Sequence, residues 1–290
     1  MKNKKNGGNI PPVYDLRVLY VPIGCGKCIE CRKQKSRQWQ VRLHEEIKYN
    51  TNGKFVTLTF NNESLNKLRS LVDTLEGYEL DNEVAKIAMR RFLERWRKKF
   101  GKSVRHWFVT ELGQTNTERL HLHGLLFTDE TKETIEERWH YGHVWLGKYV
   151  NAQTINYIVK YVHKIDEVHK EYQSRILCSQ GIGRGYLNSQ DAKNNAYKAR
   201  GTNEIYRTRK GSKLGLPIYY RNHIYTEEQR EKLWLEKLDK EERWVLGQRV
   251  CVANGDDAYW KLLEQARAKN KRLGFGDNFS SQSFSLCSSV

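Results

Sequence analysis

The chain has 290 residues, of which 38% are hydrophobic and 11% aromatic, and this is enough to bury one substantial core with appendages or two small cores. Lys and Arg number 51 against 34 Asp and Glu, and the formal charge of +17 favours nucleic acid as the partner. We expect neither membrane insertion nor secretion, because the sequence has no apolar run of about 18 residues and no apolar signal core near its start.

Binding to a membrane surface is the competing interpretation of the positive charge. The basic residues are spread through the whole chain, however, and neither end carries a lipidation motif. We therefore expect no membrane partner and a location in a cytoplasm.

The N-terminal part combines a basic arm with a cysteine cluster. Residues 1–12 are polar and basic and predict a flexible arm. A CxxCxxC pattern follows, formed by Cys25, Cys28 and Cys31. Three thiolates at this spacing could share zinc, with a fourth ligand from Cys178, Cys251 or a histidine. The alternative is a reduced, tightly turned loop that packs against a helix, and an iron–sulfur cluster fits less well than either.

The periodicity of hydrophobic residues predicts, in chain order, a helix at 32–49, a strand at 55–60, a helix at 82–100, strands at 107–112 and 120–127, and a helix at 152–164. A capping box at residues 226–229 opens a later helix. The apolar stripe of the second helix consists of Ala85, Ala88, Met89, Phe92, Trp96 and Phe100. Its basic face, a candidate DNA contact, consists of Arg90, Arg91, Arg97 and Lys98.

Short strands mixed with helices predict an α+β fold in which helices cover one face of an antiparallel sheet. The strand signals end near residue 165. We therefore divide the chain into a basic arm with the cysteine loop and a helix (1–50), a catalytic core (51–175), a loop and helical region (176–273) and a disordered tail (274–290).

Two histidines in the strand at 120–127 form a candidate metal clamp. His121 and His123 are separated by one residue, so both imidazoles project from the same face of the strand. Glu111 ends the preceding strand, and a turn at 114–117 would bring the two strands side by side. Two imidazoles and a carboxylate suit Mg²⁺ or Mn²⁺ bound together with a substrate phosphate. The alternative for Glu111 is a solvated charge at a strand end.

The helix at 152–164 carries two tyrosines and two lysines at helical spacing. Tyr157, Lys160, Tyr161 and Lys164 share one face of a helix. A phenol has a pKa near 10, so it attacks phosphorus only if cations stabilise the developing phenolate and polarise the phosphate. The lysines and a metal at the histidines could do both. The alternative is an ordinary amphipathic helix with half-buried tyrosines.

These three segments resemble, in order, the three motifs of HUH endonucleases that initiate rolling-circle replication. The resemblance is closest to the replication initiation proteins of microviruses, the gokushovirus-like single-stranded DNA bacteriophages. That group also has a Cys-Gly-Lys-Cys segment similar to residues 25–28 and a Gly-Ile-Gly-Arg loop similar to residues 181–184, which ends at Arg184, a further candidate DNA contact. A late stretch of the group is similar to residues 216–220, and the resemblance covers roughly residues 15–245.

The resemblance implies a nicking enzyme. Such proteins cut the viral strand at a single-stranded origin of the double-stranded replicative form, keep the 5′ end on a tyrosine, leave a free 3′ hydroxyl and later rejoin the strands without ATP. It also implies a ferredoxin-like or RRM-like antiparallel sheet with the histidine strand central. The chain has no GxxxxGK[ST] loop, so we expect a host helicase and a host DNA polymerase as partners in the cytoplasm of a bacterial host.

Two other classes of function stay open. A non-catalytic DNA-binding protein could use zinc at the cysteines and stack bases on the tyrosines. A hydrolytic metal-dependent nuclease could instead use an ion at the histidines to activate water, which would leave the tyrosines with a structural role.

Overall fold

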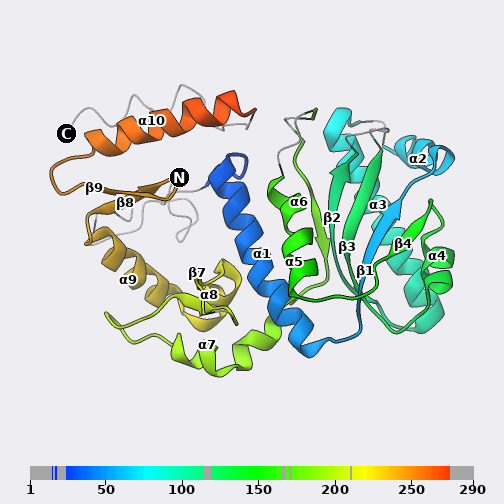
Figure 1. The fold of residues 1–290 in the computed structure, drawn as a ribbon, viewed down its shortest axis with the longest axis horizontal. Helices are drawn as coiled ribbons and strands as arrows, with labels where there is room; N and C mark the ends of the chain where they lie inside the picture. Colours follow the sequence, from blue (N-terminus) through cyan, green and yellow to red (C-terminus); the bar gives the residue numbers. More distant parts are fainter. Residues whose placement is uncertain are drawn as a thin grey trace. The chain divides into compact units, whose positions relative to one another are not determined.

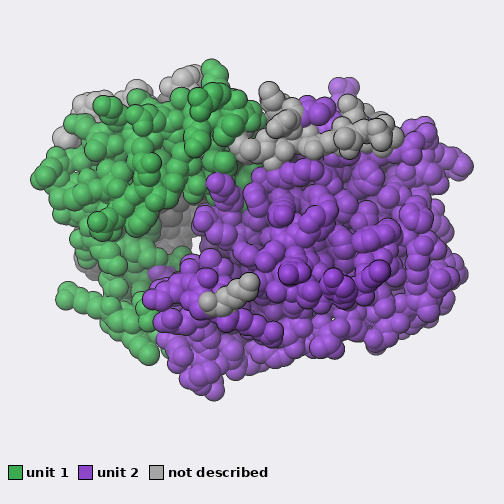
Figure 2. Space-filling view, viewed as in Figure 1, with its two compact units in different colours: residues 1–32, 196–203, 221–290 green, residues 33–195, 204–220 purple. Residues whose placement is uncertain are grey.

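The computed structural model describes Asp15, Arg17 and residues 24–72, 74–113, 119–164, 168–169, 172–209 and 211–274. The expected arm at 1–12, the expected turn at 114–117 and the expected tail beyond Gly274 lie outside the described residues. The chain divides into two compact units, coloured separately in Figure 2. The first unit consists of Met1–Arg32, Ala196–Asn203 and Arg221–Val290, and the second consists of Lys33–Asn195 and Glu204–Tyr220.

The second unit is built on a five-stranded antiparallel sheet, so the predicted α+β class with an antiparallel sheet is confirmed (Figure 1). The strand order is β4-β1-β3-β2-β5. The strands are β1 (Gly53–Thr59), β2 (Arg105–Leu112), β3 (Leu120–Phe127), β4 (Val144–Leu146) and β5 (Ile176–Cys178). The sequence predicted β1, β2 and β3, whereas the three-residue strands β4 and β5 are too short to show a period.

Helices that connect the strands cover one face of the sheet (Figure 1). These are α2 (Asn62–Arg69) and α3 (Gly77–Phe100) between β1 and β2, and α4 (Lys132–Trp139) between β3 and β4. The predicted stripe of α3 is buried here except for Phe100, which is partly buried. It packs against a set of strand residues that alternate along the sheet: Val56, Leu58, Phe108, Leu120, Leu122 and Leu126.

The opposite face of the sheet is also apolar and is covered by α1 (Ile29–Tyr49), α5 (Ala152–Ile158) and α6 (Lys160–His163). The buried residues of this face include Leu43, Phe55, Trp107, Val109, Leu125, Ile155 and Ile158. The prediction that helices cover only one face was therefore wrong. The far ends of β2 and β3 carry large apolar residues at both alternations, so each face of the sheet needs a cover.

The helix predicted at 152–164 is interrupted at Val159, which separates α5 from α6. The carbonyl oxygen of Val159 accepts a hydrogen bond from the Ser36 hydroxyl at 2.8 Å and another from the Val162 N–H at 3.2 Å. A carbonyl engaged by a side chain from α1 favours the tighter turn seen here over a continuous α-helix.

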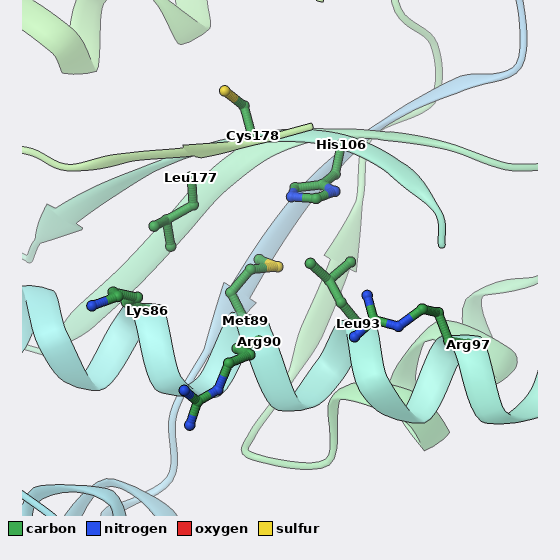
Figure 3. Close-up of a pocket in the computed structure, with 8 residues that line it drawn as sticks. All are labelled: Lys86, Met89, Arg90, Leu93, Arg97, His106, Leu177 and Cys178. Atoms are coloured by element: carbon green, nitrogen blue, oxygen red, sulfur yellow. The ribbon is translucent and has the colours of Figure 1, made fainter. Parts of the chain in front are cut away.

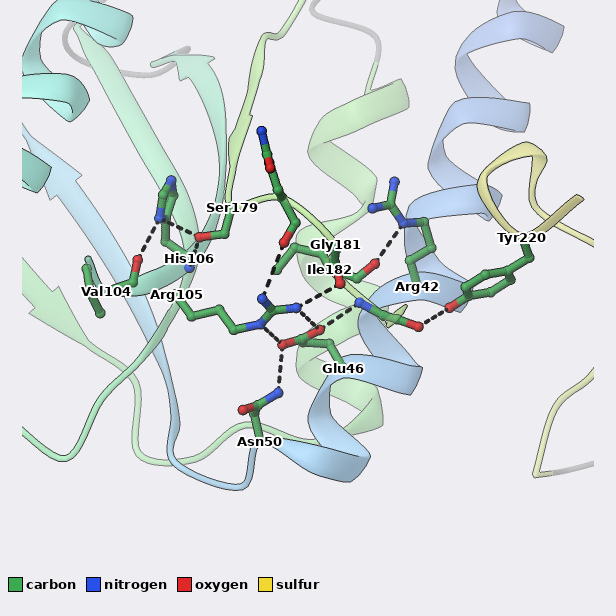
Figure 4. A network of polar contacts seen from close by, with 12 residues as sticks. Arg42, Glu46, Asn50, Val104, Arg105, His106, Ser179, Gly181, Ile182 and Tyr220 are labelled. Atoms are coloured by element: carbon green, nitrogen blue, oxygen red, sulfur yellow. Dashed lines mark hydrogen bonds and ion pairs between the residues drawn. The ribbon is translucent and has the colours of Figure 1, made fainter. Parts of the chain in front are cut away.

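A buried carboxylate ties α1 to the sheet (Figure 4). Glu46 is 2% exposed, and its oxygens accept hydrogen bonds from the guanidinium of Arg105 on β2 and from the backbone N–H of Gly183 at 2.6 Å. Asn50 donates a further bond at 2.7 Å, and Arg105 also donates to the carbonyl of Gly181 at 2.8 Å. The charge is compensated on every side, as burial of a carboxylate requires.

This network gives the Gly-Ile-Gly-Arg loop a structural role. Gly183 has a φ of 76°, and a Cβ there would lie 2.5 Å from the carbonyl oxygen of Arg42 on α1. Only glycine therefore allows this conformation and this close approach. The buried Tyr220, within the late stretch of the resemblance, donates to the Gly183 carbonyl at 2.9 Å and fixes the loop from its other side.

The remaining elements are short. The second unit also contains η2 (Arg184–Asn188), α7 (Gln190–Asn194), β6 (Ile205–Arg207) and β7 (Lys213–Gly215), and α8 (Ile218–Ile224) starts in it. The first unit contains α9 (Glu227–Leu238), β8 (Glu242–Val245), β9 (Gln248–Cys251) and α10 (Asp257–Arg272). The predicted capping box of Thr226 and Gln229 opens α9. Within the described residues, no helix has both the length and the apolar character needed to cross a membrane.

Gly124, directly after the histidines, is predicted to be essential for strand pairing. A Cβ there would lie 2.3 Å from the carbonyl oxygen of Trp107 and 2.4 Å from the Phe108 ring. We expect Gly124→Ala to lower the free energy of unfolding by about 1–3 kcal/mol, because backbone cannot yield easily. Urea denaturation of the full chain measures this, with Gly215→Ala as the control, since a Cβ at Gly215 meets nothing within 4 Å. Equal losses in both variants would contradict the prediction.

Candidate functional site

The strand register brings the predicted metal ligands to one face of the sheet. Glu111 on β2 is directly opposite His121 on β3, and His123 is opposite Thr57 on β1. Residues paired across strands point to the same side, and His121 and His123 are two positions apart. All four side chains therefore lie on the face that α1, α5 and α6 cover.

The Glu111 carboxylate joins the histidines to the tyrosine helices. Its Oε2 lies 2.7 Å from His123 Nε2, and its Oε1 accepts a hydrogen bond from Lys164 Nζ at 2.6 Å. On the other ring nitrogen, His123 Nδ1 lies 3.0 Å from the Thr57 hydroxyl. The alternative of Glu111 as a solvated charge is therefore wrong, since the side chain is only 17% exposed and has two partners.

The protonation states of this group suit metal ligation. Burial acts to raise the pKa of Glu111, but hydrogen bonds from His123 and Lys164 outweigh it and the pKa is lowered, so the carboxylate is ionised. Burial, followed by the charge of His123, lowers the pKa of His121 and keeps that imidazole neutral. An ionised carboxylate and a neutral imidazole are the forms in which these side chains bind metal ions.

The three ligand candidates are close but not collapsed around one point. The rings of His121 and His123 are 6.2 Å apart and nearly parallel. Among the residues that the structure describes, one group of at least three His, Cys, Asp or Glu side chains has all its ligand atoms within 4.8 Å, and it is the cysteine group. Glu111, His121 and His123 match Mg²⁺ or Mn²⁺ by donor chemistry, and side-chain rotation would complete the convergence.

The two tyrosines meet beside the histidines. The hydroxyls of Tyr157 and Tyr161 are 2.6 Å apart, and the Tyr161 ring stacks on His123 with centroids 4.4 Å apart. Tyr157 is 48% exposed. Burial, the hydrogen bond with Tyr157 and the negative charge of Glu111 raise the pKa of the Tyr161 phenol. The break at Val159 thus preserves the proximity that an unbroken helix predicted.

The lysines lie next to the tyrosine rings. Lys160 Nζ is 6.0 Å from the centre of the Tyr157 ring, and Lys164 Nζ is 5.6 Å from that of Tyr161. Helical spacing could predict these neighbours but not the ion pair of Lys164 with Glu111. Thr57 was also missed as a site residue, although the sequence placed it on the face of its strand opposite Val56 and Leu58.

The cysteine cluster forms a second candidate metal site, in the first unit. The sulfur atoms of Cys25, Cys28 and Cys31 all lie within 4.8 Å of one another at the start of α1, and Cys25 Sγ is 3.9 Å from Cys31 Sγ. Burial and neighbouring thiols raise the pKa of Cys28 to about 12. Burial opposes ionisation of Cys25 too, but backbone N–H groups of residues 27 and 28 lower its pKa. This cluster could bind a metal such as zinc.

The expected fourth zinc ligand is not supplied by Cys178 or Cys251, neither of which belongs to this group. The N-terminus of α1 is instead tied down by a side chain from α10. Asn270 Oδ1 accepts a hydrogen bond from the Ile29 N–H at 3.0 Å.

The predicted DNA contacts are not brought to the histidines. Arg90, Arg91, Arg97 and Lys98 lie on α3, which covers the opposite face of the sheet, and Arg184 begins η2. A pocket of about 220 Å³ lies beside α3 (Figure 3). Its lining combines basic and apolar residues: Lys86, Met89, Arg90, Leu93, Arg97, His106, Leu177 and Cys178.

The segment that holds the histidines and tyrosines matches a known protein family. The model of a family described as replication-associated protein ORF2 matches residues 53–166. The chain is also 27% identical over 298 residues to the replication-associated protein ORF2 of Spiroplasma virus 4, and the alignment covers 90% of this chain and 88% of that protein. No solved structure matches. These similarities support a viral replication protein.

The cysteine cluster is predicted to hold about one zinc ion per chain. Protein prepared without chelator should contain zinc by elemental analysis, because three thiolates within 4.8 Å form most of a tetrahedral site. Cys28→Ser should lose the zinc, whereas Cys251→Ser, at an exposed position of β9, should keep it. Zinc-free protein with three titratable thiols at 25, 28 and 31 would support the reduced loop instead.

Proposed function

We propose that this chain is an HUH-type replication initiation endonuclease that nicks a viral DNA strand at its origin and later rejoins it. The observation that carries the proposal is the contact of Glu111, His123 and Tyr161 on one face of the sheet, within the segment that matches the replication-associated family. The finer placement among microvirus-type proteins rests on the motifs at the cysteines and at residues 181–184.

The topology supports a ferredoxin-like core. The order β4-β1-β3-β2, with α3 joining β1 to β2 and α4 joining β3 to β4, follows the βαββαβ pattern, and β3 is its inner strand. The strand β5 and the helices α1, α5 and α6 are additions to that pattern.

A divalent ion, Mg²⁺ or Mn²⁺, would be held by Glu111, His121 and His123 and would supply Lewis-acid polarisation of the scissile phosphate. His123 is prepared for this role by Thr57, because a hydroxyl can either donate to or accept from Nδ1. When Nε2 carries a proton toward Glu111, Thr57 donates, and when Nε2 is a ligand, Nδ1–H donates to Thr57. Thr57 is therefore a positioning residue.

The nucleophile in this proposal is a tyrosine. A phenol oxygen of Tyr157 or Tyr161 forms a bond to phosphorus while the bond to the 3′ oxygen breaks, and the phenol proton ends on that oxygen as a 3′ hydroxyl. Lys164, beside the Tyr161 ring, supplies positive charge near a developing phenolate. The phosphodiester energy is kept in the 5′-phosphotyrosine, so rejoining needs no ATP.

Two tyrosines with hydroxyls 2.6 Å apart can reach the same phosphate position. One can hold the 5′ end while the other cuts a regenerated origin, which suits rolling-circle replication. The proposed substrates are single-stranded origin DNA and the double-stranded replicative form. A host helicase and DNA polymerase would supply unwinding and synthesis in the cytoplasm of a bacterial host.

The tyrosine assignment is tested by adduct formation. With Mn²⁺ and labelled single-stranded origin DNA, the wild type should form a denaturation-resistant protein–DNA adduct. The Tyr157→Phe/Tyr161→Phe double variant should form none, while Tyr149→Phe, an exposed tyrosine of the same region, should behave as wild type. Cleavage without adduct would identify a hydrolytic nuclease, and binding without cleavage a passive DNA-binding protein. An adduct in the double variant would refute the assignment.

The metal assignment is tested separately. His121→Ala and His123→Ala should abolish cleavage while DNA binding, which rests on many basic residues, stays salt-dependent and nearly unchanged. Thr57→Val should raise the Mn²⁺ concentration needed for half-maximal cleavage roughly 10- to 100-fold, because it removes the partner of Nδ1. His143→Ala, at an exposed histidine, serves as the control. Normal turnover in either His→Ala variant would rule out the metal clamp.

A further inference from the structure

A tryptophan at the edge of the sheet lies in line with the candidate site. Trp145 on β4 is paired with Thr57, which is paired in turn with His123, so all three lie on the same face. At a strand spacing of about 4.8 Å, Trp145 is two strands, or about 10 Å, from His123. It is nevertheless 49% exposed, and burial of a Trp would ordinarily be favourable.

Aromatic rings connect Trp145 to the proposed nucleophiles without a gap. The Phe55 ring lies edge-on to Trp145 with centroids 5.5 Å apart and edge-on to Tyr157 at 6.0 Å. Tyr157 and Tyr161 are 5.5 Å apart, and Tyr161 stacks on His123. Phe55 is itself 8% exposed and supports the rings on both sides. The row therefore begins at an open indole face and ends at the proposed metal ligand.

The charge around this row favours a polyanion. Residues 140–164 contain Lys148, Lys160 and Lys164 and not one Asp or Glu. Lys148 and Lys160 are exposed. The neighbouring Tyr149 is 67% exposed, which adds a second accessible ring on the same connection. Exposed aromatic rings interleaved with lysines are the usual means of binding single-stranded nucleic acid, because every base offers a face for stacking.

We propose that Trp145 stacks on an unpaired base of the DNA strand whose phosphate reaches the tyrosines, and that this strand enters the site across β4. The inference rests on the proposed function for the identity of the strand. An unpaired base, rather than a duplex, is required because a base pair presents only its edges. Trp145 would thus help to select single-stranded DNA and hold it in register with the scissile phosphate.

Binding to a fluorescein-labelled oligothymidylate tests the inference in the full chain. The Tyr157→Phe/Tyr161→Phe background and EDTA separate binding from cleavage. Trp145→Ala should weaken the Kd about 5- to 100-fold, whereas Trp145→Phe, which keeps a stacking ring, should recover most of the affinity. Trp244→Ala and Trp260→Ala remove exposed tryptophans of the first unit and should leave the Kd unchanged. Equal thermal unfolding of the variants shows that the fold is retained.

Two further measurements decide the outcome. Affinity for a duplex of the same composition should not depend on Trp145, and tryptophan fluorescence should be quenched by the oligonucleotide less in Trp145→Ala than in the parent. An unchanged Kd in Trp145→Ala, or an equal loss with duplex DNA, would overturn the stacking role. That failure differs from failure of the proposed function, since the latter is the absence of a tyrosine adduct in protein with both tyrosines.

Discussion

The candidate site depends on the register of β3 between β1 and β2. Backbone pairing sets Glu111 opposite His121 and Thr57 opposite His123, so one alignment determines every contact among them. A slip by one residue would turn both imidazoles into the apolar core under α3. Gly124 strengthens this alignment, because the Trp107 backbone and the Phe108 ring occupy the space that a side chain would need.

A second constraint holds the tyrosines over that face. α1 connects to β2 through the buried Glu46 and to α6 through Ser36, which bonds the Val159 carbonyl and lies 3.0 Å from His163 Nδ1. The interruption at Val159 is part of this arrangement. The polar interior contacts of α1 thus place the phenols where Tyr161 can stack on His123.

Most of the second unit could be predicted from the sequence where its pattern is strong. The alternation of Val56 and Leu58 and the stripe of α3 were sufficient for their elements, and the HxH spacing was sufficient for the shared face. What failed depends on long-range contacts: the cover on the second face, the break at Val159 and the ion pair of Lys164 with Glu111. Local periodicity holds no information about the partner that a carbonyl or carboxylate will meet.

The first unit takes its residues from both ends of the sequence, Met1–Arg32 and Arg221–Val290, and this orders events during synthesis. Residues 33–220, with the sheet and both tyrosines, leave the ribosome before α10 exists. The cysteine turn is synthesised earlier still, but its neighbour Ile29 obtains the partner Asn270 only near the end of translation. A nascent chain can therefore complete the sheet well before it completes the cysteine region.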